Sequence, residues 1–172
     1  MSASCGVGEW CHVAGVPESH LNHVLRAAIG WFELGSYTEA LGELDRLAVA
    51  ERNRTETLEL RAVILQQMDR WDEAAQAYTV LCGREGAPVD RFIAWGCCLY
   101  ELGRVAECRL ALLSAPGEAR MCGLWNFHLA CYESLLGNKD EARRLVRECL
   151  RLEPSLSDMV HRNENLAPLV GA

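Results

Sequence analysis

A step of about 34 residues separates four turn residues along the chain, and this period constrains the fold more than any other feature. Gly35, Gly103 and Gly137 end the segments ELG, ELG and LLG, and Asp69 stands at the matching place after QQM. Self-similarity at a fixed period of this size is typical of repeat proteins, in which each unit is one supersecondary element stacked on its neighbours. The sequence therefore predicts a repeat array.

Other positions keep the same step, and their residue types predict paired helices. Small residues let two helices approach closely, while bulky residues fill the space beside them. An acidic position falls in the first turn of each second helix, where the helix dipole favours negative charge. The small positions are Ala28, Ala62, Gly96 and Ala130, and Ala40, Ala74, Cys108 and Ala142; the bulky position is Leu44, Tyr78, Leu112 and Val146; the acidic position is Glu39, Glu73, Glu107 and Glu141.

With these positions in phase, the stretch 21–156 resembles the tetratricopeptide repeat, whose unit is a helix–turn–helix of about 34 residues. The resemblance implies an all-α, right-handed superhelix of about four helix pairs with a C-terminal capping helix. Asn126 and Glu133 depart from the pattern, because they stand at places that are usually apolar. Further residues that carry the resemblance are the aromatic Tyr37 and Trp71, the turn glycines, and Pro154 at the end of the last unit.

Turn residues and Pro/Gly breaks set the expected boundaries. We expect a flexible segment over 1–16 and a repeat domain over 17–172, with repeats at about 21–54, 55–88, 89–122 and 123–156 and a cap at 157–172. In the cap, Leu156, Met159 and Val160 are expected to cover the last repeat. The expected helices run from after Ser19 to Gly35 and over Tyr37–Glu51, Thr55–Met68, Trp71–Cys82, Val89–Leu102, Arg104–Ser114, Ala119–Leu136, Lys139–Leu152 and Leu156–Asn163.

The resemblance also implies that the first helix of each pair lines a concave groove that binds a peptide segment of a partner protein. The residues that map there are mostly apolar or aromatic, with acidic residues beside them, which suits a peptide with hydrophobic anchors and some positive charge. The alternative is that these side chains pack against neighbouring helices or the N-terminal segment. The expected groove residues are Leu25, Ile29, Phe32, Val63, Gln66, Ile93, Cys97, Tyr100, Phe127 and Cys131.

One binding mode of the resembling family does not fit this sequence. Members that bind the C-termini of chaperones clamp the terminal carboxylate with Lys and Asn. The corresponding places here hold Leu25, Ile29, Leu60, Asp90 and Ala94, so a cationic clamp is missing. We expect a scaffold, adaptor or chaperone-like module for another protein segment, and not an enzyme.

Charge and cysteine content narrow the partner and the compartment. Lys and Arg number 17 against 24 Asp and Glu, and the formal net charge of -7 argues against nucleic acid as the main partner. The nine cysteines have no regular framework spacing, which favours a reducing cytoplasm over a disulfide scaffold. No stretch is long and apolar enough to span a membrane, and no export signal is visible. We expect a cytoplasmic protein without a membrane or nucleic-acid partner.

A second hypothesis depends on Cys5, Cys11, His12, His20 and His23. Two Cys and two His could form a tetrahedral zinc site, and the protein would then be metal- or thiol-dependent. The spacing C-x5-C-H-x7-H-x2-H matches no standard zinc motif, and the alternative is a tail followed by surface histidines. The sequence has no glycine-rich phosphate loop and no HExxH motif. We therefore expect no cofactor, no bound metal and no catalytic residues.

Overall fold

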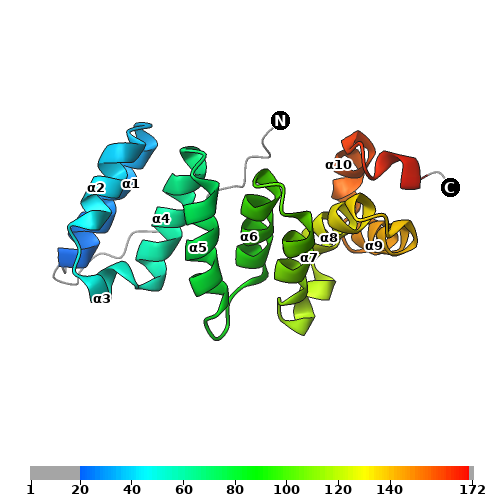
Figure 1. Ribbon diagram of the computed structural model, residues 1–172, viewed down its shortest axis with the longest axis horizontal. Coiled ribbons are helices and arrows are strands. Elements are labelled where there is room, and N and C mark those ends of the chain that lie inside the picture. The colour runs from blue at the N-terminus through cyan, green and yellow to red at the C-terminus, as the bar shows by residue number, and fades with distance from the viewer. Residues whose placement is uncertain (1–19, 171–172) are drawn as a thin grey trace.

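A computed structural model describes residues 20–170, and these residues form ten α-helices, three short 3-10 helices and no strand (Figure 1). The helices of the four pairs are α1 (His20–Glu33) with α2 (Tyr37–Asp45), α4 (Thr55–Gln67) with α5 (Trp71–Cys82), α6 (Val89–Glu101) with α7 (Val105–Leu113), and α8 (Gly123–Leu135) with α9 (Lys139–Leu152). The remaining elements are α3 (Val49–Arg52), η1 (Gly117–Met121), η2 (Pro154–Leu156), α10 (Ser157–Arg162) and η3 (Ala167–Leu169).

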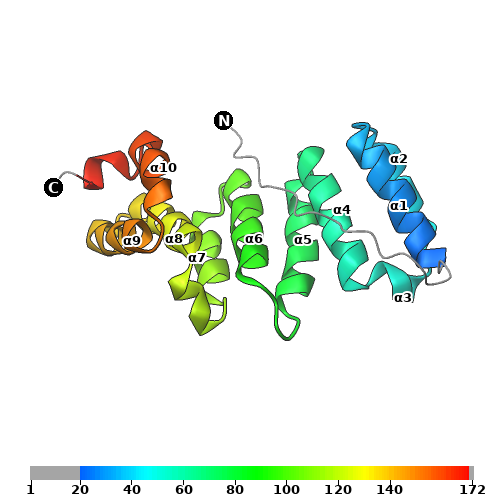
Figure 2. The same cartoon turned by 180° about the vertical axis from the view of Figure 1, so that it is seen from behind.

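The pairs stack side by side along one axis, which confirms the predicted all-α repeat fold (Figure 1). Figure 1 shows the side that carries α2, α5 and α7, and Figure 2 shows the opposite side with α1, α4 and α6. We call these sides the outer and the inner face. The small residues predicted at the helix crossings are buried, and Ala28, Ala62, Ala130 and Gly96 lie in the core between units.

The four turn residues have the left-handed backbone conformation that ends each first helix. Gly35, Gly103 and Gly137 have φ of 74°, 71° and 85°. Asp69 takes the same role with φ 55°, which is the one positive φ of a non-glycine residue in the described chain. Glycine adopts this conformation without the penalty that a Cβ brings, and Asp tolerates it better than most residues. The period in the sequence therefore marks the turns directly.

The helix predicted over Tyr37–Glu51 is interrupted, because α2 ends at Asp45 and the separate turn α3 follows. The guanidinium of Arg52 donates to the backbone carbonyl oxygens of Asp45 at 2.6 Å and Leu47 at 2.7 Å. Carbonyl groups at a helix end need such a partner when the helix does not continue. Leu47 is buried, and Ala48 is extended with ψ 154°.

The fourth first helix also begins later than predicted. Residues 117–121 form η1, Cys122 is extended with ψ 120°, and α8 starts only at Gly123. The Asn126 amide donates to the carbonyl oxygens of Arg120 at 2.9 Å and Cys122 at 2.8 Å. The polar residue that departs from the repeat pattern therefore fastens η1 to α8.

The C-terminal residues close the array as a cap on α8 and α9. Leu156 and Val160 are buried, as are Leu166 and Leu169 beyond them. Met159, which we expected to cover the last repeat together with Leu156 and Val160, is exposed instead of buried. The polar residues Asp158, Arg162 and Glu164 face solvent, which suits the end of a solenoid.

Candidate inner-face binding site

The inner face is built from the first helices of consecutive units, and side chains that are nearly one repeat apart in the sequence meet on it. Arg91 of α6 pairs with Glu59 of α4 at 2.6 Å. The Gln66 amide donates to the Cys98 sulfur at 3.3 Å and accepts from the Tyr78 hydroxyl at 3.0 Å. These contacts fix α4 against α5 and α6. Gln66 was expected to line the groove, and its amide is used within the fold instead.

Six of the expected groove residues are half-buried, and one is exposed. Tyr100 has 43% of its surface exposed, and its ring lies 6.1 Å from the buried ring of Tyr132. Phe32 contacts Tyr37 at a centroid distance of 5.6 Å, which leaves part of its ring accessible. An exposed aromatic ring on a repeat surface is a common anchor for a partner. The half-buried residues are Leu25, Ile29, Phe32, Val63, Gln66 and Cys97.

The other three expected groove residues, Ile93, Phe127 and Cys131, are buried in the core. A partner cannot contact them on the surface of this structure, so their assignment to the lining needs correction. Beside α8, the C-terminal segment covers part of the surface. Ser134 donates to the carbonyl oxygen of Asn165 at 2.8 Å, and the Asn163 side chain hydrogen-bonds Cys131. The expected groove residues that keep accessible surface therefore lie on α1, α4 and α6.

A polar cluster joins α6 to α8 beside Tyr100. The Cys97 sulfur lies 3.9 Å from Nδ1 of His128, and it also hydrogen-bonds the Tyr132 hydroxyl. Burial lowers the pKa of His128 to about 4, so the imidazole is neutral at physiological pH. Sequence reasoning missed this contact because His128 has no obvious partner along the chain. Cys97 and His128 are 31 residues apart in the sequence, close to the repeat length, and this spacing could have indicated the contact.

The depressed pKa of His128 predicts a stability loss in mild acid. The unfolded imidazole binds a proton below its ordinary pKa of 6.5, whereas the folded one does so only near about 4. The stabilising contribution is present above the unfolded value and is lost as the pH falls between these two values. We expect wild type to lose about 2 kcal/mol more than His128→Gln between about pH 7 and about pH 5. Urea unfolding of both proteins at each pH measures the difference.

Both proteins contain the same carboxylates, so the contribution of carboxylate protonation to the pH dependence of the unfolding free energy cancels in the comparison. Equal slopes of unfolding free energy against pH for wild type and His128→Gln would contradict the prediction. The ring of Tyr132 lies 6.3 Å from the imidazole, and burial raises the pKa of the Tyr132 hydroxyl, so Tyr132 gains no charge in this range.

The thiols of the core are poorly suited to nucleophilic chemistry. Burial raises the pKa of several of them to about 12, or about 11 for Cys149, so they stay protonated and packed as small apolar groups. The affected residues are Cys82, Cys98, Cys108, Cys131 and Cys149.

The proposed N-terminal metal ligands are only partly visible. His20 and His23 are exposed on α1, while Cys5, Cys11 and His12 lie outside the described residues. Within residues 20–170, no group of three or more Cys, His, Asp or Glu is arranged to hold a metal ion. No helix of that range is long and apolar enough to cross a membrane.

Acidic side chains without an ion pair flank the inner face. Glu33, Glu56, Asp90 and Glu101 lie on α1, α4 and α6 and are exposed. None of the ion pairs between described residues uses them. By contrast, the arginines of α4 and α6 are paired: Arg61 with Asp45, and Arg91 with Glu59. The unpaired charge of α4 and α6 is therefore negative.

The fold and this face define an all-α helical-repeat protein of stacked helix pairs. Solved structures of MamA have the same fold: one crystal structure is 14% identical with a TM-score of 0.70 and 81% of each chain covered. MamA 41-end from Desulfovibrio magneticus RS-1 is 16% identical, with a TM-score of 0.68, 87% of this chain and 88% of that chain covered. No family model and no curated protein sequence matches the chain. At these identities the likeness concerns the fold.

Proposed function

We propose that the protein is a binding module, a scaffold or adaptor that holds a peptide segment of a partner on its inner face, and that it is not an enzyme. The observation that carries the proposal is the exposed ring of Tyr100 on α6, beside the half-buried Cys97. Aromatic residues dominate binding energy at protein interfaces, and an exposed one on a rigid helix costs little entropy to use. The reducing environment favoured by the unpaired cysteine pattern points to the cytoplasm.

The bound segment would cross α6, α4 and α1. Tyr100 supplies an aromatic anchor in unit three, and Leu25, Ile29 and Phe32 supply a second apolar area in unit one. The cap covers the equivalent surface of α8, so the segment ends before unit four. The fold of stacked helix pairs supports this mode, because repeat arrays present extended surfaces to extended or helical peptides.

Charge complementarity favours a peptide that contains Lys or Arg. Glu56 and Asp90 lie in the first turns of α4 and α6, Glu33 and Glu101 are the last residues of α1 and α6, and none of the four has an ion pair with another described residue. A peptide with apolar anchors spaced between Lys or Arg residues fits this surface. Such charges raise the rate of association and suppress acidic competitors more than they raise affinity.

A displayed library of random peptides, selected on the wild-type protein, tests the proposal. Enriched peptides should combine aromatic or aliphatic residues with Lys or Arg. Their affinity, measured by fluorescence anisotropy, should fall about thirty-fold in Tyr100→Ala and in Phe32→Ala, since a hot-spot residue contributes about 2 kcal/mol.

Val80→Ala is the matched control, because Val80 is an exposed apolar residue on the outer helix α5. It should leave the affinity of these peptides unchanged. Enriched peptides that bind Tyr100→Ala and Phe32→Ala as tightly as wild type would overturn the inner-face assignment. Melting temperatures of the variants show whether the fold is intact.

A further inference from the structure

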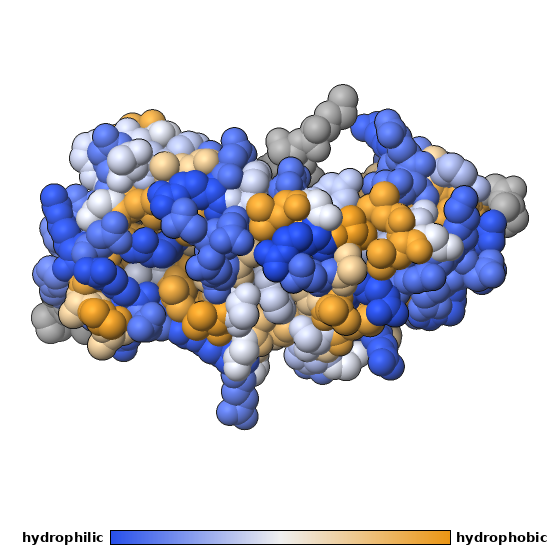
Figure 3. All heavy atoms as spheres, viewed as in Figure 1, coloured by the Kyte–Doolittle hydropathy of each residue, from blue (hydrophilic) through white to orange (hydrophobic). Residues whose placement is uncertain are grey.

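Two exposed leucines on the outer face of unit three stand at places where the other units have polar residues or glycine. Leu110 and Leu113 lie one turn apart on α7, and 61% and 45% of their surfaces are exposed. In the other units, the places in phase with these two hold Gly42, Gln76 and Arg144, and Asp45, Thr79 and Arg147. The repeat fold therefore does not require leucine at either place. Figure 3 shows apolar surface over α7 on this face.

Met121 extends the exposed leucines across η1. Its surface is 67% exposed, and it lines a cleft of about 480 Å³ together with Leu113, Trp125 and Leu129. A second cleft of about 560 Å³ shares Leu113 and Leu129 and continues toward the start of α9. We call Leu110, Leu113 and Met121 the outer patch, and the two joined clefts the outer cleft.

The floor of the outer cleft is rigid. The Trp125 indole donates to the carbonyl oxygen of Leu112 at 3.0 Å, and Leu129 is buried behind it. Because α8 starts only at Gly123, Arg120 and Met121 lie on η1, and both line the cleft. The part of the cleft beside Met121 and Trp125 is lined mainly by apolar surface, which suits the anchor residues of a ligand.

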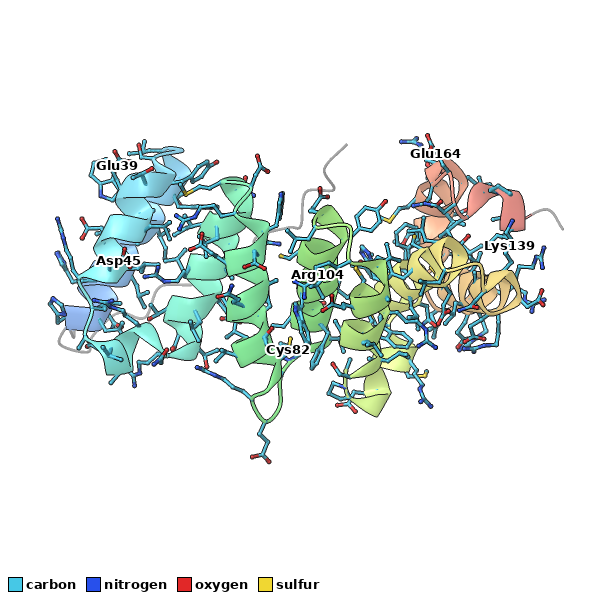
Figure 4. The ribbon with its side chains drawn as sticks, in the orientation of Figure 1. Glu39, Asp45, Cys82, Arg104, Lys139 and Glu164 are labelled. Carbon is cyan, nitrogen blue, oxygen red and sulfur yellow. The ribbon has the colours of Figure 1, made fainter. Side chains whose placement is uncertain are left out.

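The charges along the outer cleft differ in their pairing. Arg109 pairs with Glu133 and Arg144 with Glu141, both at 2.6 Å, and Glu148 pairs with Arg151. Arg120 and Lys139 line opposite parts of the cleft and enter none of the ion pairs between residues 20–170. Figure 4 shows Lys139 at the start of α9, toward the C-terminal end of the array. In a chain with a net charge of -7, the unpaired charge of this cleft is positive.

We propose that the outer cleft is a second docking site, which takes an acidic amphipathic segment of a partner protein. The apolar residues of this segment lie against the outer patch, and the carboxylates of the segment lie near Arg120 and Lys139. The inner face, with unpaired acids, selects basic segments, and the outer face selects acidic ones. The protein therefore joins two partners of opposite charge. The joining of two partners rests on the proposed function, whereas the docking of an acidic segment in the outer cleft does not depend on the inner-face peptide.

Two synthetic amphipathic peptides test the outer cleft. Both have about 20 residues, enough to form a helix when bound, with leucine on one face and either glutamate or lysine on the other. Fluorescence anisotropy should show the acidic peptide binding to wild type. Its affinity should fall at least about ten-fold in Leu110→Gln/Leu113→Thr and in Arg120→Glu/Lys139→Glu, and fall with added salt.

The first double variant takes both residues from the same places in unit two, so its melting temperature should equal that of wild type. Tyr100→Ala is the matched control, which should weaken inner-face peptides and leave the acidic peptide unaffected. Failure of the acidic peptide to bind wild type, or equal binding to wild type and both double variants, would overturn the proposal. So would wild-type dimers that dissociate in Leu110→Gln/Leu113→Thr, because the outer patch would then bind a second copy of this chain.

Discussion

Gly96→Leu is expected to leave the protein largely unfolded. Gly96 lies in the middle of α6, where a Cβ alone would be 2.5 Å from Cδ1 of Leu112 and 3.2 Å from the Tyr132 hydroxyl oxygen. Leu112 and Tyr132 are buried, so neither can move into solvent. Overpacking of a well-packed core costs about 1–3 kcal/mol, and three further carbon atoms in this contact raise the cost beyond the usual range. Thermal unfolding followed by circular dichroism measures it.

Gly30→Leu is the matched control for that experiment. Gly30 also lies within a first helix, but a Cβ there has no neighbour within 4 Å. The substitution should raise the melting temperature, because glycine in a helix interior costs up to about 1 kcal/mol relative to other residues. Wild-type stability of Gly96→Leu would show that α6, α7 and α8 do not approach as closely as this structure has them.

The repeat period predicted the turns and the helix crossings because both depend on single residues. A left-handed turn needs Gly or a tolerant residue such as Asp69, and a close crossing needs a small residue such as Gly96. The break after α2 could not be predicted in the same way. It depends on Arg52 reaching back to two carbonyl groups, and an arginine at that place is equally compatible with a continuous helix.

The site was predicted less completely than the fold for a physical reason. The position of a residue within the repeat predicts the direction in which its side chain points from the helix. It does not predict which other residues cover that side chain. Phe127 and Cys131 are both buried, and beside Cys131 the covering group is Asn163 of the cap, which hydrogen-bonds its thiol. The contact of Cys97 with His128 joins two units, so neither unit alone contains it. The outer patch follows only when unit three is compared with its neighbours.

Arg109→Met is expected to cost about 3 kcal/mol of unfolding free energy, because it leaves a buried carboxylate without its cation. The side chain of Glu133 has only 3% of its surface exposed, and Arg109 reaches its Oε1 at 2.6 Å. Asn138 donates to the other carboxylate oxygen at 2.6 Å. When the arginine is removed, the carboxylate stays buried with a single amide partner. An uncompensated buried charge is strongly destabilising, by about 3–5 kcal/mol, and the remaining hydrogen bond places this loss at the lower end.

Two further variants separate the destabilisation caused by an unpaired buried charge from the loss of stability caused by removing any paired arginine. Arg104→Met removes an equally short ion pair, with Glu107, but both partners are exposed, so the loss should stay below about 1 kcal/mol. Arg109→Met/Glu133→Met removes the carboxylate together with its partner and should recover most of the stability, because an apolar pair can replace a buried ion pair. The coupling energy comes from urea unfolding of wild type, the two single variants at 109 and 133, and this double variant. Two results would contradict this explanation: equal losses of unfolding free energy for Arg109→Met and Arg104→Met, or a double variant that is less stable than both single variants. In either case the loss would not come from an unpaired buried charge.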